Sequence, residues 1–305
     1  MGRYRFVETS TDVVTSNHVQ YRDIIRGRFN IDRGHRYTIG AGISSGTTFV
    51  SSWNNTGVGT GDLMTNHSLR ILYGSAIPIP GLELQYGGLY IARGESTEIT
   101  TYDDDGYVVG ERVSIRRPKD LFFDEIAATR GLVGPFSTPS LTKRWRGLHE
   151  ANYRQFLLAK RVGGHIRTSG DYTYDSGAET LLAAVAVGFA PGAPVAALRY
   201  EQYWRVRVNP AAGFSVSVER PVGKRFRLQA GYATIDEFYG GWNADRIQRG
   251  KRVFAVGTLP LTRELTLALF ATQAFDGAYT LSNRTRTDVI LTYDLLRTLQ
   301  NARVF

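Results

Sequence analysis

Cysteine is absent from this chain of 305 residues. Its absence excludes disulfide scaffolds and cysteine-based metal or redox chemistry. Long apolar runs are also missing: the longest, at 181–190, has roughly half of the ~20 residues that a transmembrane helix needs. Met1 is not followed by a charged segment and then an apolar one. We therefore expect the sequence of an exported protein to be a mature or trimmed form.

Lysine is scarce, and arginine supplies nearly all of the positive charge in a chain with a formal net charge of +9. Three interpretations are open: a basic solvated surface, a pore that attracts anions, or a face that binds nucleic acid. Glycine is abundant, with 33 residues, and aromatic residues make up 12%. With few convincing helical segments, this composition indicates an all-β fold. The mean hydropathy of −0.22 is typical of a soluble protein, but alternating strands average their two faces and hide a membrane surface.

The segment 199–209 alternates between two kinds of side chain. Its even-numbered positions are mainly aromatic or apolar, and the odd-numbered ones are mainly long and charged: Arg199, Glu201, Tyr203, Arg205, Arg207 and Asn209. A period of two indicates a strand, because successive side chains point to opposite faces. One cationic face and one aromatic face fit a wall between water and lipid.

The same two-faced pattern recurs along the chain, at about 20–32, 36–44, 165–174, 225–232 and 284–295. Each segment has about 10 to 14 residues, near the length that crosses a bilayer at a tilt. The repeated pattern predicts a membrane barrel built from many strands of similar length.

The connections between these segments differ in length. Short ones lie at 33–35, 79–81, 118–119, 163–164, 221–223 and 260–262, and longer polar ones at about 46–64, 95–106, 134–148, 235–250 and 275–284. Short turns on one side and long loops on the other are typical of outer-membrane barrels. If the short turns face the periplasm, the count gives sixteen strands with both termini on that side, provided that 3–13 and 179–189 are strands. Without these two, the count is fourteen.

With these features, the chain resembles the bacterial outer-membrane β-barrel proteins, and among them the sixteen-stranded porins and the polysaccharide-export channels. The resemblance lies in the architecture and covers most of the chain. Phe305 matches the terminal aromatic residue that the family's assembly machinery reads. The resemblance implies one transmembrane, antiparallel, up-and-down β-barrel in the outer membrane of a Gram-negative bacterium. We expect it to occupy 1–296, with a short tail at 297–305, because the regular alternation stops at Leu295.

Arginine on the inner face would attract anions and hold carboxylate or phosphate groups through paired hydrogen bonds. Alternatively, the arginines pair with carboxylates on neighbouring strands and brace the wall, for example with Asp23, Asp124, Glu125, Glu201 and Asp294. Because 37 cations face 28 anions, we favour a positive lumen. The candidate pore-lining residues are Arg22, Arg26, Arg28, Arg199, Glu201, Arg205, Arg207, Arg225, Arg227, Arg284 and Arg286.

We expect a channel for passive passage of small or polymeric anionic solutes, with no cofactor and no metal. Its expected surroundings are outer-membrane lipid and lipopolysaccharide, and it could form a homo-oligomer. Nucleic acid is not expected, because the aromatic side chains of 199–209 lie opposite the arginines. The alternatives are a barrel that does not transport (an adhesin, a scaffold or the anchor of a periplasmic region), a lipid-modifying barrel enzyme, and a soluble basic β-protein.

Catalysis is not favoured, because the sequence contains no G-x-S-x-G and none of its five histidines has a metal-ligand spacing. Two loops invite functional interpretations. The acidic loop at 95–106 fits no standard calcium loop, and we expect a solvated tip. The loop at 238–250 could fold inward as a constriction or contact a sugar, but we favour an ordinary exposed loop.

Overall fold

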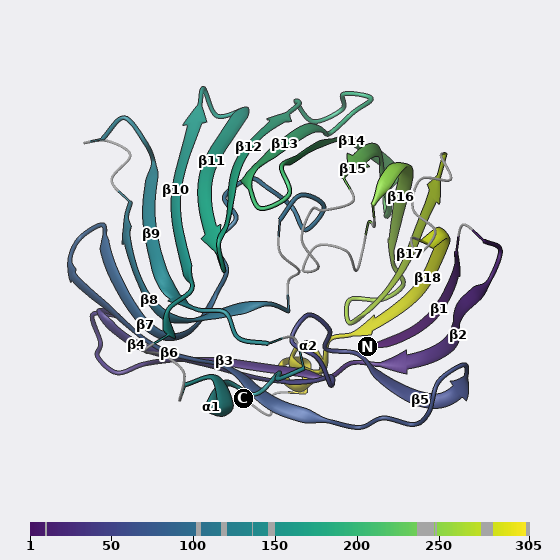
Figure 1. The fold of residues 1–305 in the computed structure, drawn as a ribbon, viewed down its shortest axis with the longest axis horizontal. Coiled ribbons are helices and arrows are strands. Elements are labelled where there is room, and N and C mark those ends of the chain that lie inside the picture. The colour runs from purple at the N-terminus through teal and green to yellow at the C-terminus, as the bar shows by residue number, and fades with distance from the viewer. Residues whose placement is uncertain are drawn as a thin grey trace.

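The structure is a computed structural model that describes residues 1–9, 11–101, 105–116, 121–135, 137–145, 150–236, 247, 249–275 and 283–302. Within this part of the chain, antiparallel strands form one sheet that curves into a ring (Figure 1). The described strands are β1 (Gly2–Thr9), β2 (Val14–Tyr21), β3 (Ile24–Asn30), β4 (Tyr37–Ser45), β5 (Asn54–Gly59), β6 (His67–Ile79), β7 (Leu82–Tyr90), β8 (Tyr107–Ile115), β9 (Glu125–Leu132), β10 (Tyr153–Val162), β11 (Ile166–Asp175), β12 (Ala178–Gly188), β13 (Ala197–Arg207), β14 (Ala211–Val222), β15 (Phe226–Ile235), β16 (Gly250–Pro260), β17 (Leu265–Ala274) and β18 (Asn283–Tyr293). Two short helices are described, α1 (Leu141–Trp145) and α2 (Leu295–Asn301).

Four of these eighteen strands combine into two long ones. Tyr21 of β2 lies opposite Asn54 of β5, whereas Ile24 of β3 lies opposite Ser44 of β4. β2 and β3 therefore run as one strand along β4 and β5, and residues 46–53 interrupt the second of these long strands. The described wall thus has sixteen strand positions, as expected from the sequence. Both of the uncertain strands, at 3–13 and 179–189, are present as β1 and β12.

Pairing between β1 and β18 joins the two ends of the sheet. Gly2 lies opposite Leu291 of β18 on one side and opposite Tyr21 of β2 on the other. The pairings therefore pass through all sixteen positions and return to the start. Two edges are exceptions among the described strands. β5 pairs only with β2. β3 pairs only with β4, and every β3 residue after Ile24 is exposed. The ring is open along this edge, beyond Met1.

The connections sort by length onto the two ends of the ring. Five of the six expected short turns join strands at one end, the turn end, where Gly2 and Tyr293 also lie, and the sixth, at 118–119, lies outside the described residues. The strand ends that flank the long connections 91–106, 133–152 and 236–249 lie at the opposite, loop end. The sorting has exceptions, because 176–177 and 208–210 are short connections at the loop end and 189–196 is a longer one at the turn end.

The turn between β3 and β4 shows the local chemistry of the turn end. The carboxylate of Asp32 accepts hydrogen bonds from the backbone N–H of Tyr37 at 2.8 Å and of Gly34 at 3.1 Å. The bond from Tyr37 lowers the pKa of Asp32, because it favours the charged carboxylate. His35 adopts a positive φ of 53°, which histidine tolerates better than most residues. The sequence around residues 32–37 therefore specifies the reversal.

The outer face of the wall is apolar and exposed. On β13, Tyr200 and Trp204 each keep 43% of their surface exposed, whereas Glu201 and Tyr203 between them are buried. The alternation thus assigned the two faces correctly for residues 199–204, but an irregular register places Arg207, expected on the inner face, opposite outward Glu179. Aromatic rings also contact one another along this face. The ring centroids are 6.1 Å apart for Tyr200 and Phe214, 5.9 Å for Phe214 and Tyr232, and 6.3 Å for Tyr232 and Phe275.

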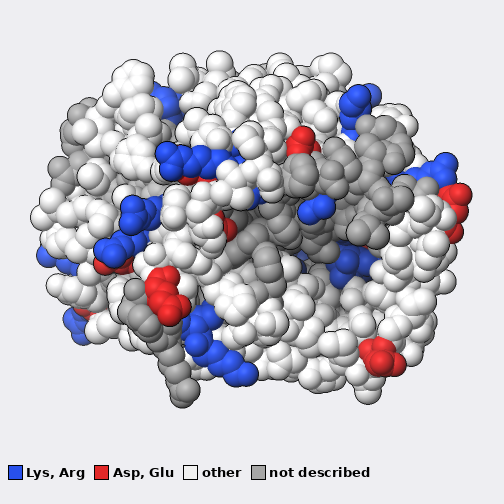
Figure 2. Space-filling view, viewed as in Figure 1, with Lys and Arg blue, Asp and Glu red and all other residues white. Residues whose placement is uncertain are grey.

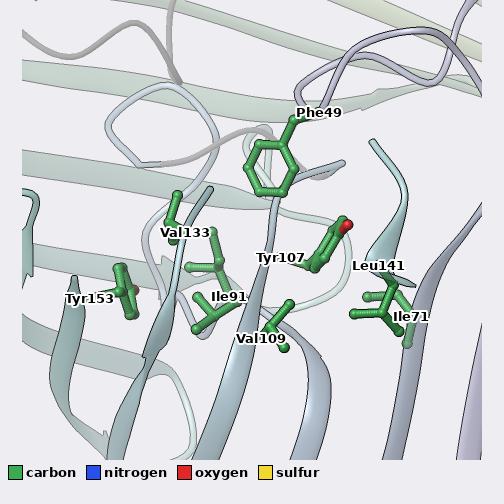
Figure 3. Close-up of a cluster of buried hydrophobic side chains, with 9 residues drawn as sticks. Phe49, Ile71, Ile91, Tyr107, Val109, Val133, Leu141 and Tyr153 are labelled. Carbon is green, nitrogen blue, oxygen red and sulfur yellow. The ribbon is translucent and has the colours of Figure 1, made fainter. Parts of the chain in front are cut away.

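A cluster of buried apolar side chains lies at the loop end of β6 to β10 (Figure 3). Phe49 joins it from the interruption at 46–53, and Leu141 joins it from α1. The guanidinium of Arg144 lies 3.7 Å from the centroid of the Phe49 ring and donates hydrogen bonds to the carbonyl oxygens of Pro135 and Thr138. Burial lowers the pKa of Arg144 to about 10. These contacts hold α1 and the interruption at 46–53 against the strand ends.

α2 follows β18 directly. The carboxylate of Asp294 accepts the backbone N–H of Arg297 at 3.1 Å and so caps the first turn of the helix. The expected boundary at residue 296 therefore lies inside α2, and Phe305 lies outside the described residues. Neither described helix is long and apolar enough to cross a membrane.

Replacing an outward apolar side chain in the middle of a strand tests the assignment of the outer face. Leu269 of β17 is 46% exposed and lies midway between the two ends. We expect Leu269→Arg to lower the free energy of unfolding in lipid vesicles by about 2–4 kcal/mol, because a cation at the bilayer midplane is poorly solvated. Denaturant titration followed by tryptophan fluorescence measures the change. Leu269→Met is the matched control, and equal stability of the two variants would contradict the outer-face assignment.

Candidate functional site

The connection between β7 and β8 folds into the ring instead of extending outward. Its first part, residues 91–101, is called the inward segment below. Gln155 of β10 donates a hydrogen bond from Nε2 to the carbonyl of Ala92 at 2.7 Å. The backbone N–H of Glu95 donates to Oγ of Ser169 on β11 at 2.8 Å. The segment is thus attached to the inner wall, and the expected solvated acidic tip at 95–106 is wrong for the described residues, because wall side chains hold the loop inside.

Glu201 of β13 is the strongest attachment point. Its carboxylate accepts the backbone N–H of Thr97 at 2.8 Å and the hydroxyl of Thr97 at 2.7 Å. The hydroxyl of Thr100 donates to the same carboxylate. Glu201 is only 1% exposed, so these hydrogen bonds satisfy a charged group that would otherwise be buried at high cost. The alternation of β13 directs Glu201 inward, and the threonines of the inward segment meet it there.

A second carboxylate on the inward segment is surrounded by arginine. One oxygen of Glu95 lies 3.3 Å from Nε of Arg167 on β11 and 3.7 Å from a guanidinium nitrogen of Arg199 on β13. Arg199 also donates a hydrogen bond to the carbonyl of Glu95. Two guanidinium groups therefore lie against one carboxylate.

The middle of the inward segment packs on the opposite strands. Ile99 is buried with Phe254 of β16 and Phe270 of β17. A cavity of about 80 Å³ lies between the segment and this part of the wall, lined in part by Thr97, Ile99 and Gln229. The segment therefore reaches from the β10 side of the ring to the β16 side and narrows the space between them.

The return of the connection toward β8 is fixed at another part of the wall. Asp105 accepts the backbone N–H of Ser52 at 2.9 Å and forms an ion pair with Arg22 at 2.5 Å. The guanidinium of Arg3 stacks on the ring of neighbouring Trp53, 3.9 Å from its centroid. The interruption at 46–53 and the connection 91–106 thus meet inside the ring.

A cluster of arginines surrounds one buried carboxylate at the seam between β1 and β18. Asp288 lies 3.0 Å from Nε of Arg5, 2.6 Å from Arg286 and 3.8 Å from Arg3. The side chains of Asp288, Arg3 and Arg286 are each at most 4% exposed, whereas Arg5 is 12% exposed. Three guanidinium groups therefore surround one carboxylate on this inner surface. Figure 2 shows basic side chains in the central hollow as well as along the rim.

The structure places the candidate pore-lining residues in different surroundings. Five of the arginines are in ion pairs: Arg22 with Asp105, Arg199 with Glu95, Arg207 with Glu179, Arg284 with Asp12, and Arg286 with Asp288. Arg26 lies over the ring of Tyr90, 5.1 Å from its centroid. The remaining candidates are exposed or half-buried arginines: Arg28, Arg205, Arg225 and Arg227. Only Arg199 and Glu201 of this set bind the described inward segment.

Of the carboxylates considered as braces, Glu125 and Asp294 pair with arginines, whereas Asp124 and Asp23 have a lysine and a histidine as partners. Among the described contacts, Asp124 pairs with Lys160, Glu125 with Arg116, and Asp294 with Arg297. Asp23 lies 3.5 Å from His67. These pairs join neighbouring strands or turns near the ends of the wall.

Sequence reasoning missed three residues that the structure brings into the site. Arg3 and Arg5 alternate with Tyr4 and Phe6, so the period of two in 2–7 could have identified them. Glu95 carried no such signal, because its partners come from strands 72 and 104 residues away. The possible constriction at 238–250 lies mostly outside the described residues. Among the residues that are described, no group of three His, Asp or Glu side chains could hold a metal ion.

Weakening the attachment at Glu201 should loosen the inward segment. We expect Glu201→Gln to lower the free energy of unfolding by about 1–3 kcal/mol, because the new amide N–H₂ faces donors of Thr97 or Thr100. We also expect more current noise in single-channel recordings. Glu219→Gln is the matched control, since Glu219 lies on the inner face of β14 and has no described contact with the segment. Equal noise in both variants would argue against the attachment.

No protein-family model matches the chain, and no curated protein sequence matches it. Solved structures do match. OmpF of Salmonella typhi, in a complex with daunomycin, is 12% identical to this chain and covers 96% of both chains with a TM-score of 0.62. A mutant of the Rh. blastica porin is 10% identical, covering 96% of this chain and 97% of the porin with a TM-score of 0.58. Another mutant of that porin reaches a TM-score of 0.59 at 11% identity. The chain therefore has the fold of the bacterial porins.

Proposed function

We propose that the protein is an outer-membrane channel through which small anionic solutes diffuse passively. The observation that carries this proposal is the excess of guanidinium groups on the inner wall, around Asp288 and Glu95. The porin fold supports the channel, and the positive inner surface supports the preference for anions.

The location in the outer membrane follows from the difference between the outer and inner faces of the wall. An exposed apolar outer face, with strands that satisfy one another's backbone groups, suits hydrocarbon surroundings. Barrels of this kind occur in bacterial outer membranes. Outer-membrane lipid and lipopolysaccharide are then the partners of the outer face, and its exposed apolar side chains also suit association of several copies.

The charge balance inside the ring favours anions. Around Asp288 three guanidinium groups face one carboxylate, and around Glu95 two face one. Arginines that outnumber carboxylates at these two places would lower the energy of an anion in the lumen and raise that of a cation. Planar guanidinium groups also bind carboxylate or phosphate through two parallel hydrogen bonds. No covalent step is involved: solutes would exchange water for weak, replaceable contacts as they pass.

Reversal potentials in planar bilayers test the charge preference. Under a potassium chloride gradient we expect chloride to be more permeant than potassium. The preference should decline from 0.1 to 1 M salt, because the Debye length falls from about 10 to about 3 Å. A preference for potassium, or no conductance from protein that shows heat-modifiable gel migration, would contradict the proposal.

Arg227 is the residue to change, because it is exposed on the inner face of β15. Arg227→Gln should lower the ratio of chloride to potassium permeability roughly twofold, since a unit charge ~8 Å away in water contributes about 0.5 kcal/mol. Arg220→Gln, nearby on the outer face of β14, is the matched control. If both substitutions change the ratio equally, Arg227 does not act through the lumen.

A further inference from the structure

Two arginines lie side by side on the outer face of the wall. Arg130 of β9 and Arg154 of β10 are directly opposite in the strand register, and both are exposed. Neighbouring residues on the same strands confirm that both arginines point outward. Phe156 is 45% exposed on the outer face, whereas Thr129 and Gln155 are buried toward the lumen. Like charges directly opposite each other destabilise a sheet, so this pair needs a counter-charge.

The protein supplies little of that counter-charge. Within the described part of the chain, neither Arg130 nor Arg154 is in an ion pair. Arg154 lies over the ring of Tyr174, 5.9 Å from its centroid. By contrast, Arg207 of β13 forms an ion pair with Glu179 of β12 at 3.2 Å. Arg130 and Arg154 therefore differ from Arg207, because neither has a carboxylate at ion-pair distance among the described residues.

The side chains around this pair change from polar to apolar between one outward row of register partners and the next. The row of register partners that contains the two arginines is Tyr86, Glu111, Arg130, Arg154, Tyr174 and Glu179. The next outward row toward the turn end is apolar, apart from a tyrosine hydroxyl: Leu84, Val113, Ala128, Phe156, Tyr172 and Leu181. Tyrosine at such a boundary is typical of the level of lipid headgroups. Glu111 is a neighbouring anion that compensates at most one of the two cations.

An apolar groove begins beside the pair. Val113 of β8, the register partner of Ala128, lines an outward groove of about 760 Å³ that continues over β7, β6 and β4. Leu72, Leu84 and Tyr86 form part of its lining. Trp145 of α1 also lines it and contacts Tyr86 edge to face at 5.7 Å between ring centroids. A cationic pair next to a long apolar groove complements a molecule with an anionic head and hydrocarbon chains.

We propose that Arg130 and Arg154 bind the phosphate of an anionic lipid in the leaflet at the loop end, and that its acyl chain lies in the adjacent groove. This inference rests on the proposed function only in placing the outer face in a membrane. Two guanidinium groups can hold one phosphate through charge-assisted hydrogen bonds, and the phosphate removes the repulsion between them. The site is separate from the lumen, because it lies on the other face of β9 and β10.

Native mass spectrometry of protein from nanodiscs tests the site, with equal amounts of phosphatidylglycerol and phosphatidylcholine as probes. We expect the natural protein to retain phosphatidylglycerol preferentially. Arg130→Gln with Arg154→Gln should reduce that preference about tenfold or more, because two charge-assisted hydrogen bonds are lost. The pair of lysine substitutions at the same positions should keep much of it.

Two further variants distinguish lipid binding at this site from binding through net charge and from effects on the channel. Arg161→Gln with Arg227→Gln removes two inward cations. This pair should leave lipid retention unchanged while it alters the reversal potential, and the outward pair should do the opposite. Gly74→Leu narrows the groove without changing charge, because a Cβ at this position has open space. It should weaken retention of the lipid.

Three outcomes would overturn the inference. One is equal phosphatidylglycerol preference in the natural protein and the outward double variant. Another is an equal loss in the inward double variant, which would mean adventitious binding through net charge. The third is a change in oligomeric state without a change in lipid retention, which would assign the pair to a contact between copies. Heat-modifiable migration confirms that each variant is folded, and channel recordings report the lumen independently.

Discussion

Backbone pairing between neighbouring strands is the constraint on which the rest of this structure depends. In hydrocarbon, an unpaired N–H or C=O costs several kcal/mol, so a wall of strands must satisfy its own hydrogen bonds. Pairing from β1 to β18 meets this requirement around the ring. It also fixes which side chains face inward, because a strand that is held on both sides cannot shift by one residue without exchanging its two faces. The edges of β3 and β5 are described places where strand pairing is missing on one side.

That same constraint explains why so much of the fold could be predicted from the sequence. The period of two in 199–209 is a local property, and it assigned Trp204 outward and Glu201 inward correctly. Gly and Pro at the short turns gave the strand count, because turn chemistry is also local. The break between β4 and β5 could not be predicted in this way. Residues 46–53 leave the wall to bury Phe49 against Arg144, and that partner is 95 residues away.

The candidate site was less predictable because its contacts are not local. The inward segment is held by Glu201, 104 residues from Thr97, and its acidic residues suggested a solvated loop tip. Composition cannot tell a carboxylate in water from one that accepts arginine hydrogen bonds, as Glu95 does. Each of these buried charges is stable only when its partner is present. The segment and the wall must therefore assemble together, and the shape of the lumen depends on contacts that no single strand encodes.

Net charge alone says little about which surface an arginine serves. The excess of +9 first suggested a positive lumen, yet alternation directs some cations inward and others outward. Inside the ring, Arg5 pairs with Asp288 and Arg167 pairs with Glu95. Arg130 and Arg154 lie on the opposite face of the wall. An inward arginine can be solvated by water in the lumen, so an excess there is tolerated and can act on passing ions. An outward arginine lacks that water and needs an anion, which the protein supplies to Arg207 as Glu179. We therefore propose that the same side chain favours a permeating anion on one face of the sheet and a bound lipid on the other.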